Sequence, residues 1–313
     1  MVQRIDRFKG FWRECDLNYY AVFDVGGSAI KYSLMNEEGE FIEKASVPTP
    51  REGLDEFIQV IDVLVKEFQQ KQVIKGIALS MPGAVNVEKG HIEGSSAVPY
   101  VHGPNIKQIL EERTGLTVEL ENDANCAGLA EGWIGAAKDV KDYICIVIGT
   151  GIGGALVLDK KIRHGHNLHG GEFGYMIMED YLEQPLGDSW SSLGATGALI
   201  RLVAKRKGLD PSTLNGKKVF ELADAGDEEV KDEIEKFIKR LAVGILNLQY
   251  AIDPEKILIG GAISSREDLV DRINEKLEQM KTNAHKLSIK VEKCQFGNDS
   301  NLIGALYHYL QRN

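Results

Sequence analysis

Three glycines at a fixed spacing are the first residues in this chain that indicate a chemistry. Gly149, Gly151 and Gly154 form the pattern G-x-G-x-x-G, which in dinucleotide-binding folds opens a helix whose N-terminus holds the pyrophosphate. In this chain a strand-forming run, 143–148, comes before the glycines, and another, 155–158, follows them. The glycines therefore join strand to strand, and the pattern does not predict a dinucleotide-binding loop.

A second glycine turn has the same setting. The strand-forming run 20–24 leads into Val25–Ser28, and a further strand-forming run covers 29–35. Glycines in such a turn let a phosphate approach the backbone N–H groups, because no Cβ intervenes. The two hairpins predict a duplicated unit whose two phosphate-binding turns lie on opposite walls of one cleft.

Asp123 is the candidate for a general base. Transfer of a phosphoryl group to a hydroxyl needs a held nucleotide, an aimed hydroxyl and a group that accepts the hydroxyl proton. Asp123 follows Asn122 and opens an apolar helical pattern over 124–133, so its carboxylate also fits the N-cap of a helix. The two roles can coexist, because in a loose transition state the hydroxyl loses its proton late and positioning matters most.

Charged and metal-binding side chains lie near both glycine turns. Asp24 ends the first strand and is suited to act on a magnesium ion through a water molecule, and Lys31 could contact a phosphate. The alternatives are an aspartate that initiates a turn and a lysine on a solvated edge. His164, His166 and His169 could hold a metal, but glycines punctuate their segment, so the sequence favours flexible surface histidines.

The composition excludes several classes of protein. With 313 residues, of which 43% are hydrophobic and 27% charged, the chain is long enough for two domains with cores of their own. A formal net charge of −10 argues against nucleic acid or an anionic membrane as the main partner, because either would need a basic face. No apolar run approaches the roughly 20 residues that span a bilayer, and no signal peptide opens the chain, so we expect a cytoplasmic protein. The four cysteines are scattered without a C-x-x-C pair, which predicts neither a disulfide framework nor a cysteine zinc site.

The elements that must position these residues repeat along the chain. The first half predicts an antiparallel meander of three strands, then an amphipathic helix and a buried strand. The second half predicts a hairpin, and later a long helix that leads into another buried strand. We therefore expect an α/β fold made of two copies of one unit. The expected elements are strands at 20–24, 29–35, 41–47 and 74–80 with a helix at 54–68, and strands at 143–148, 155–158 and 256–259 with a helix at 230–250.

Several motifs, in order, resemble those of the ROK sugar kinases, within the superfamily of actin-like proteins, sugar kinases and heat-shock ATPases. The resemblance runs from about Tyr20 to the C-terminus. It implies an actin-like α/β fold of two duplicated RNase H-like lobes around a nucleotide and sugar cleft. The motifs are Asp24–Ser28 with Lys31, Glu121–Asn125, Ile148–Gly154, Gly171–Gly174 and Ile259–Gly261.

The resemblance also implies a domain organisation. An N-terminal extension, 1–19, would precede a small lobe, 20–121, which the C-terminal helix 296–313 completes, and a large lobe would cover 122–295. The family includes repressors with a DNA-binding domain ahead of the kinase fold, but residues 1–19 are too few for one. The resemblance further implies a homodimer.

Individual residues take roles from the same resemblance. Asp123 would be the catalytic base, and ATP and magnesium would be the cofactors. Sugar hydroxyls would be bound by Asn105, Asn122, Asp123, Glu172 and Tyr175. ATP and its phosphates would be bound by Asp24, Gly26, Gly27, Ser28, Lys31, Gly149, Thr150, Gly151, Gly153, Gly260 and Gly261, with Asp24 also acting on the magnesium ion.

Two departures distinguish this chain within the family. Its runs Gly171–Met176 and Gly297–Ala305 are most similar to those of the β-glucoside kinases. Most ROK kinases carry a histidine where Tyr175 stands and a cysteine-rich loop after it, which together hold a structural zinc. Both are missing here, and because a partial ligand set binds weakly, we expect no zinc. A second sugar-contacting carboxylate of the family would fall near Ser191.

These observations predict an ATP-dependent kinase that phosphorylates the C6 hydroxyl of a glucose-type sugar, with β-glucosides such as cellobiose as the preferred class. A glucokinase or an N-acetylmannosamine kinase is the alternative among enzymes. A sugar-sensing regulator without turnover is the alternative of another class, and the intact Asp123 and phosphate turns argue against it. The missing helix after Gly154 argues against a Rossmann dehydrogenase.

Overall fold

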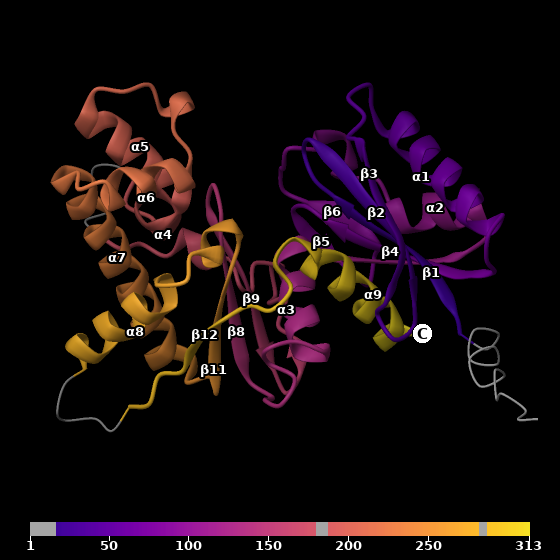
Figure 1. Cartoon of the computed structure of the whole chain (residues 1–313). Helices are drawn as coiled ribbons and strands as arrows, with labels where there is room; N and C mark the ends of the chain where they lie inside the picture. Colours follow the sequence, from indigo (N-terminus) through magenta and orange to yellow (C-terminus); the bar gives the residue numbers. More distant parts are fainter. Residues whose placement is uncertain (1–16, 180–186, 282–286) are drawn as a thin grey trace, which may run out of the picture. The chain divides into compact units, whose positions relative to one another are not determined.

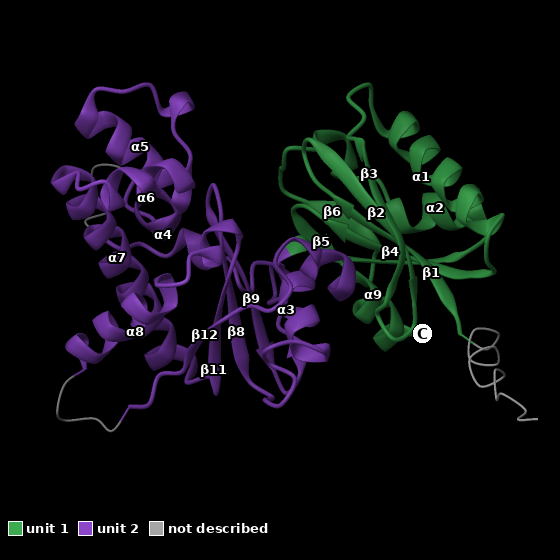
Figure 2. Ribbon diagram, in the orientation of Figure 1, with its two compact units in different colours: residues 1–123, 305–313 green, residues 124–304 purple. Residues whose placement is uncertain are grey.

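The computed structural model describes residues 17–179, 187–281 and 287–313. Its contacts divide the chain into two compact units, Met1–Asp123 with Ala305–Asn313, and Ala124–Gly304 (Figure 2). The chain leaves unit 1 at the start of helix α3 (Asp123–Trp133) and returns to it within helix α9 (Ser300–Arg312). The resemblance implied boundaries at 122 and 296. Most of the expected N-terminal extension lies outside the described residues.

Unit 1 is built on a five-stranded sheet in the order β3-β2-β1-β4-β7. The first three strands form the predicted antiparallel meander, and β4 and β7 continue the sheet parallel to β1. The carboxyl ends of β1, β4 and β7 therefore lie at one edge of the sheet. The elements are β1 (Tyr19–Val25), β2 (Ala29–Asn36), β3 (Phe41–Pro48), α1 (Leu54–Gln69), β4 (Ile74–Met81), β5 (Ala84–Asn86), β6 (His91–Glu93), the 3₁₀ turn η1 (Pro99–Val101), α2 (Ile106–Thr114) and β7 (Thr117–Asn122).

Helices α1 and α2 lie on one side of the unit 1 sheet and α9 on the other (Figure 1). The apolar residues of α1 recur at helical spacing, and Phe57, Ile61 and Val65 are fully buried among the strands. Each such side chain contributes about 1.5 to 3 kcal/mol when it leaves water. On the other side, Gly76 of β4 has no room for a side chain, because Tyr309 of α9 lies against it. The predicted helix 54–68 is thus confirmed, and packing holds it in place.

Unit 2 is built on a second five-stranded sheet, in the order β10-β9-β8-β11-β12. Its first three strands are antiparallel, and β11 and β12 continue parallel to β8. The elements are β8 (Tyr143–Ile148), β9 (Ile152–Leu158), β10 (Lys161–Ile162), the 3₁₀ turn η2 (Phe173–Tyr175), α4 (Trp190–Gly194), α5 (Thr196–Lys207), η3 (Pro211–Thr213), α6 (Gly216–Asp224), α7 (Glu228–Ile252), β11 (Lys256–Gly260), η4 (Ala262–Ser265), α8 (Leu269–Met280), β12 (Val291–Lys293) and η5 (Gly297–Asp299).

The two sheets repeat one plan of strand order and direction. Both begin with an antiparallel meander whose first strand then pairs with two parallel strands. The predicted duplication is therefore confirmed at the level of the sheets. The structure corrects one detail: β9 begins at Ile152, not at Ala155, so Gly153 and Gly154 lie within a strand and the turn is only Gly149–Gly151.

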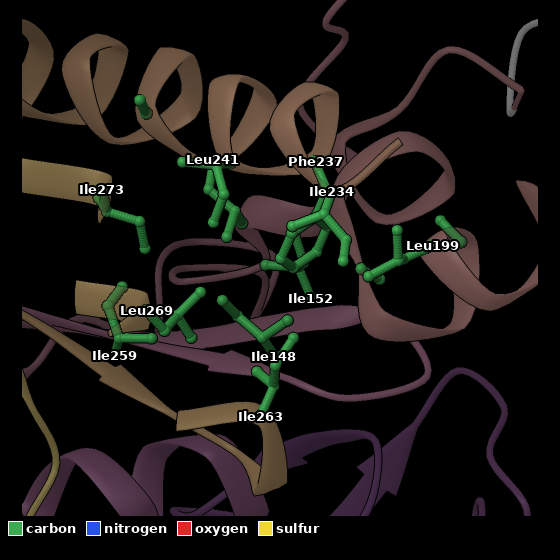
Figure 3. Close-up of a cluster of buried hydrophobic side chains, with 14 of the residues drawn as sticks. Ile148, Ile152, Leu199, Ile234, Phe237, Leu241, Ile259, Ile263, Leu269 and Ile273 are labelled. Atoms are coloured by element: carbon green, nitrogen blue, oxygen red, sulfur yellow. The ribbon is translucent and has the colours of Figure 1, made fainter. Parts of the chain in front are cut away.

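The core of unit 2 forms between α7 and the second sheet. Ile234, Phe237 and Leu241 of α7 point toward Ile148 and other side chains of the sheet (Figure 3). These four named side chains are at most 1% exposed. Leu269 and Ile273 of α8 belong to the same cluster. This packing holds β8 and β11, the strands that lead into the glycine segments.

Candidate functional site

The first glycine turn lies at the carboxyl end of β1 in unit 1. Asp24, near the end of that strand, is 6% exposed. Its Oδ1 accepts a hydrogen bond from Ser80 of β4 at 2.9 Å, and its Oδ2 pairs with Lys31 of β2 at 3.1 Å. The turn itself is closed by the Gly26 N–H, which donates to the Ala29 carbonyl at 3.0 Å. The structure thus brings Asp24, Lys31 and the turn together, as the motif in the sequence suggested.

Asp123 follows the carboxyl end of β7, at the same edge of that sheet. Its Oδ1 accepts a hydrogen bond from Asn122 Nδ2 at 3.1 Å, and the same amide nitrogen donates to the Gly83 carbonyl at 3.0 Å. The backbone N–H of Asn122 is held by Oε1 of the fully buried Glu121 at 2.7 Å. The Asn122 side chain therefore links the candidate base to the turn that follows β4.

Asn105 has a structural role in unit 1. It caps α2, and its side chain accepts the backbone N–H of Gln108 at 2.9 Å. Capping of this kind stabilises a helix by about 1 kcal/mol. The Asn105 side chain is thus engaged with its own helix.

The second glycine turn, Gly149–Gly151, joins β8 to β9 in unit 2. It is closed by the Gly149 N–H, which donates to the Gly151 carbonyl at 2.9 Å. The first residue of β9 is held by Ser191, whose Oγ accepts the Ile152 N–H at 2.8 Å. Ser191 therefore braces the hairpin, at the position near which a family carboxylate would fall.

The segment that carries Glu172 and Tyr175 packs on the same hairpin. Phe173 occupies the space above Gly154, where a Cβ would sit 2.5 Å from its ring. Gly171, with φ of +94°, passes so close to the Gly154 carbonyl that a side chain would not fit. The residues on either side of Glu172 thus pack on β9, the strand that follows the second glycine turn. Tyr175 is 66% exposed, so its ring presents a free aromatic face.

A cavity of about 800 Å³ opens beside the second glycine turn. This volume lies in the range of small-molecule sites. Gly149 and Thr150 form one part of its wall, the first turn of α5 and residues along the whole of α6 another, and η4 a third. Helix N-termini carry partial positive charge and free N–H groups, which favour anions. The wall of the cavity therefore combines a glycine turn and two helix N-termini.

Arg266 and the aromatic ring of Phe220 also line this cavity. The guanidinium carbon of Arg266 lies 4.5 Å from the centroid of the buried Phe220 ring. Both of its terminal nitrogens bond Asp224 at 3.1 Å. The hydrogen bonds from Arg266 lower the pKa of the Asp224 carboxyl, so this pair stays charged. A flat, fixed guanidinium on an aromatic ring is suited to packing against a planar ligand.

Sequence reasoning found only part of this cavity. Among the predicted nucleotide residues of unit 2, Gly149 and Thr150 line it, whereas Gly151, Gly153, Gly260 and Gly261 do not. Gly260 lies within β11, and Gly261 immediately precedes the lining residues of η4. The residues that the sequence did not indicate include Thr196, Gly197, Asn215, Gly216, Phe220 and Arg266. Asn215 before Gly216 is a helix-cap signal that could have pointed to α6.

The described residues contain no group of three or more histidine, cysteine, aspartate or glutamate side chains arranged for a metal ion. His166 and His169 are exposed, and His169 Nδ1 contacts the Asn167 carbonyl. Residues 180–186, which follow Tyr175 in the region where the resemblance would place a zinc loop, lie outside the described residues. In the part of the chain that the structure covers, no helix has the length and apolar character to cross a bilayer.

Comparison with known proteins now gives the class of protein. The chain matches the model of the ROK family over residues 19–312. It is 34% identical to a β-glucoside kinase of Listeria monocytogenes over 292 residues, which cover 93% of this chain and 97% of that protein. The chain belongs to the ROK family, and the predicted resemblance, with β-glucoside kinases among the similar proteins, is confirmed.

Solved structures support the same assignment. A ROK family protein of Streptococcus pneumoniae in complex with sucrose is 36% identical, with a TM-score of 0.86 over 94% of this chain and 98% of that one. A ROK family glucokinase of Streptomyces griseus, in complex with glucose and AMPPNP, is 25% identical, with a TM-score of 0.77 over 92% of this chain and 98% of that one. The predicted actin-like α/β fold is therefore confirmed.

Proposed function

We propose that this protein is an ATP-dependent sugar kinase that phosphorylates the C6 hydroxyl of a glucose-type ring, with β-glucosides as its preferred substrates. The observation that carries the kinase assignment is the cavity of about 800 Å³ beside the turn Gly149–Gly151. Its glycine turn and helix N-termini suit phosphates, and Arg266 on Phe220 suits a planar base. The similar glucokinase that is bound to AMPPNP supports ATP as the phosphoryl donor.

In the proposed reaction, Asp123 accepts the proton of the sugar hydroxyl. Its Oδ1 accepts a hydrogen bond from the Asn122 amide, which helps to fix the orientation of the carboxylate. Phosphoryl transfer depends on positioning and on stabilisation of charge more than on the strength of the base. We propose that the glycine turns contribute backbone N–H groups to phosphate binding.

Asp24 is the residue we propose for magnesium. A magnesium ion prefers oxygen ligands and keeps several of its waters, and it would neutralise charge on the phosphates. Asp24 is a buried carboxylate at the phosphate turn, with Ser80 and Lys31 holding both oxygens. This donor set fits an ion held through a water better than one held by a direct bond.

The preference for β-glucosides rests on the segment Glu172–Tyr175 and on Ser191. We propose that Glu172 and Asn122 bind hydroxyls of the ring, with Asn105 at the margin of the sugar site. Ser191 is committed to the hairpin backbone and is shorter than a carboxylate, and Tyr175 is exposed. A short side chain at Ser191 and an exposed aromatic ring at Tyr175 would favour a substrate with a β-linked substituent at its anomeric carbon.

The proposal is tested by an ADP-release assay with glucose, cellobiose, gentiobiose, an aryl β-glucoside, fructose and N-acetylmannosamine. We expect kcat/KM for cellobiose or the aryl glucoside to equal or exceed that for glucose, with phosphate on the six-position of the non-reducing ring. A site that bonds a free anomeric hydroxyl would reject glycosides, because their binding leaves buried polar groups unpaired. A tenfold or greater preference for glucose or N-acetylmannosamine would instead establish one of those kinase activities. Binding of sugar without any ADP release would support a sugar-sensing regulator. The implied homodimer is tested by light scattering on the same preparation.

A further inference from the structure

His102 connects two turns of unit 1. Its Nε2 lies 2.8 Å from Ser96 Oγ. The ring also lies against Gly83, where a Cβ would sit 2.9 Å from His102 Cε1. Because Gly83 has φ of +100°, neither the backbone conformation nor the space there admits a side chain. His102 thus forms a hydrogen bond with the turn that contains Ser96 and packs against the turn that contains Gly83.

The Gly83 side of this connection leads to the candidate base. The Gly83 carbonyl accepts the hydrogen bond from Asn122 Nδ2, and the same amide donates to Asp123 Oδ1. A shift of the Gly83 turn would therefore move the amide, and with it the orientation of the Asp123 carboxylate.

The Ser96 side leads to the first phosphate turn. Ser96 Oγ accepts the Val98 N–H at 3.2 Å, and the Val98 side chain is 1% exposed, so the backbone around Ala97 is fixed. Ala97 lies directly on Gly27, where a Cβ would sit 2.5 Å from the Ala97 Cβ. The hydroxyl of Ser96 therefore holds the segment that packs on the turn Gly26–Ser28.

Stability alone does not explain a histidine at this position. His102 Nδ1 is buried and has no hydrogen-bond partner within the described part of the chain. A buried polar atom without a partner costs about 1 to 3 kcal/mol, and a phenylalanine ring would avoid this cost. What phenylalanine cannot supply is the bond from Nε2 to Ser96.

We infer that His102 is a positioning residue for phosphoryl transfer: through Ser96 and Gly83 it fixes the Asp123 carboxylate relative to the phosphate turn Gly26–Ser28. This inference rests on the proposed kinase function. His102 touches no reacting atom in this scheme and acts only through its two neighbours. The inference predicts that loss of the bond between His102 and Ser96, by substitution of either residue, lowers kcat more than it changes the KM values.

The first test does not depend on turnover. In protein labelled with ¹⁵N-asparagine, the side-chain amide signal of Asn122 is assigned by its loss in Asn122→Asp. We expect this signal to shift, and its amide protons to exchange faster with solvent, in both His102→Phe and Ser96→Ala. The matched control is His91→Phe, which changes a histidine on β6 whose ring pairs with Glu93. An unchanged Asn122 signal in the first two variants would overturn the inference, even if the wild type proves to be inactive.

The second test measures turnover with the best sugar of the panel. We expect kcat to fall about ten- to hundredfold in His102→Phe and in Ser96→Ala, because a small misplacement of a catalytic group costs this much. The double variant should lose no more than either single variant, since both break the same bond. His91→Phe should keep the wild-type kcat. Wild-type rates in both single variants would refute the inference and leave the kinase assignment intact, whereas a wild type without activity on any sugar would refute the kinase assignment.

Discussion

At the scale of single residues, hydrogen bonds within the fold hold several side chains of the proposed site. The Asn122 amide bonds both Gly83 and Asp123, and Ser191 bonds the first residue of β9. Asn122 and Asp123 were predicted to contact the sugar, and Ser191 was predicted to stand near the position of a carboxylate in the family. Orientation of the reacting groups is thus part of the folded structure, which lowers the entropy cost of the reaction.

The first prediction concerns the base. Asp123→Asn keeps the size of the side chain but cannot accept the hydroxyl proton. We expect kcat to fall by about two to four orders of magnitude, the range usual for loss of a general base, while sugar affinity stays within a few-fold. Steady-state kinetics and calorimetric titration of the sugar measure the two effects. Near-normal turnover would mean that Asp123 serves the helix alone, and a large loss of Tm would show that it also caps α3.

The second prediction concerns the nucleotide cavity. Gly197 of α5 donates its N–H to the Gly149 carbonyl at 3.2 Å, and a Cβ on it would sit 2.5 Å from the Thr150 carbonyl oxygen. Gly197→Ala must therefore displace the phosphate turn. We expect the KM for ATP to rise about tenfold or more, although alanine favours a helix over glycine by about 1 kcal/mol. Sugar binding without nucleotide, measured by calorimetry, is the control and should not change. A KM for ATP within twofold of the wild type would contradict this role of the turn.

At the scale of elements, buried carboxylates tie helices to their neighbours. Glu131 of α3 is fully buried and accepts the backbone N–H groups of Ala136, Gln295 and Phe296 at 2.8 to 3.1 Å. Asp62 of α1 accepts bonds from Arg113 at 2.8 Å and from Lys66 at 2.9 Å. The first carboxylate holds the segment before α9 in unit 2, and the second joins α1 to α2 in unit 1.

These two carboxylates predict opposite dependences of stability on pH. Burial raises the pKa of the Glu131 carboxyl, and its three backbone hydrogen bonds offset this only in part. Its stabilising effect is therefore complete below the unfolded pKa of about 4.3 and is lost as the pH rises through the folded pKa. Burial would also raise the pKa of Asp62, but the bonds from Lys66 and Arg113 lower it. Its stabilising effect is present above about pH 3.9 and is lost as the pH falls through the folded pKa.

Urea unfolding of Glu131→Gln and Asp62→Asn, carried out from about pH 3 to about pH 7, measures this difference. As the pH rises, the free energy of unfolding of the wild type should fall relative to Glu131→Gln and rise relative to Asp62→Asn. Each substitution should lower the free energy of unfolding by about 1 to 3 kcal/mol at the pH values where the stabilising effect of the native carboxyl is present. Parallel pH profiles for the two variants would contradict the assigned environments.

At the scale of the whole molecule, one sheet plan is used twice, and each copy carries a glycine turn between its first two strands. The resemblance to the ROK family predicts that this chain lacks the histidine and cysteines of a structural zinc site in the second copy. We expect the purified protein to contain no stoichiometric zinc and to keep its Tm when it is treated with a zinc chelator. Elemental analysis checks the first point and calorimetry the second. About one zinc per chain would contradict the prediction and direct attention to His164, His166 and His169.

The sequence by itself determined the parts whose signals are local. The meander, the helix α1 and the two hairpins are encoded by apolar spacing and glycine turns within short segments, and all of them are present. Even there, the start of β9 was misplaced, because the pattern of glycines does not reveal that Phe173 covers Gly154 and leaves it within a strand.

Only the tertiary structure decided which distant residues share a site. The cavity is walled by α5, α6 and η4, whose lining residues lie far along the chain from Gly149 and carry no common motif. The bonds that join Ser191 to Ile152, and Gly83 to Asn122, likewise connect segments whose proximity depends on strand register and on the path of the chain. A local pattern specifies turns and faces, but buried polar groups find their partners only when the sheets have assembled, and this pairing is what turns the motifs into a site.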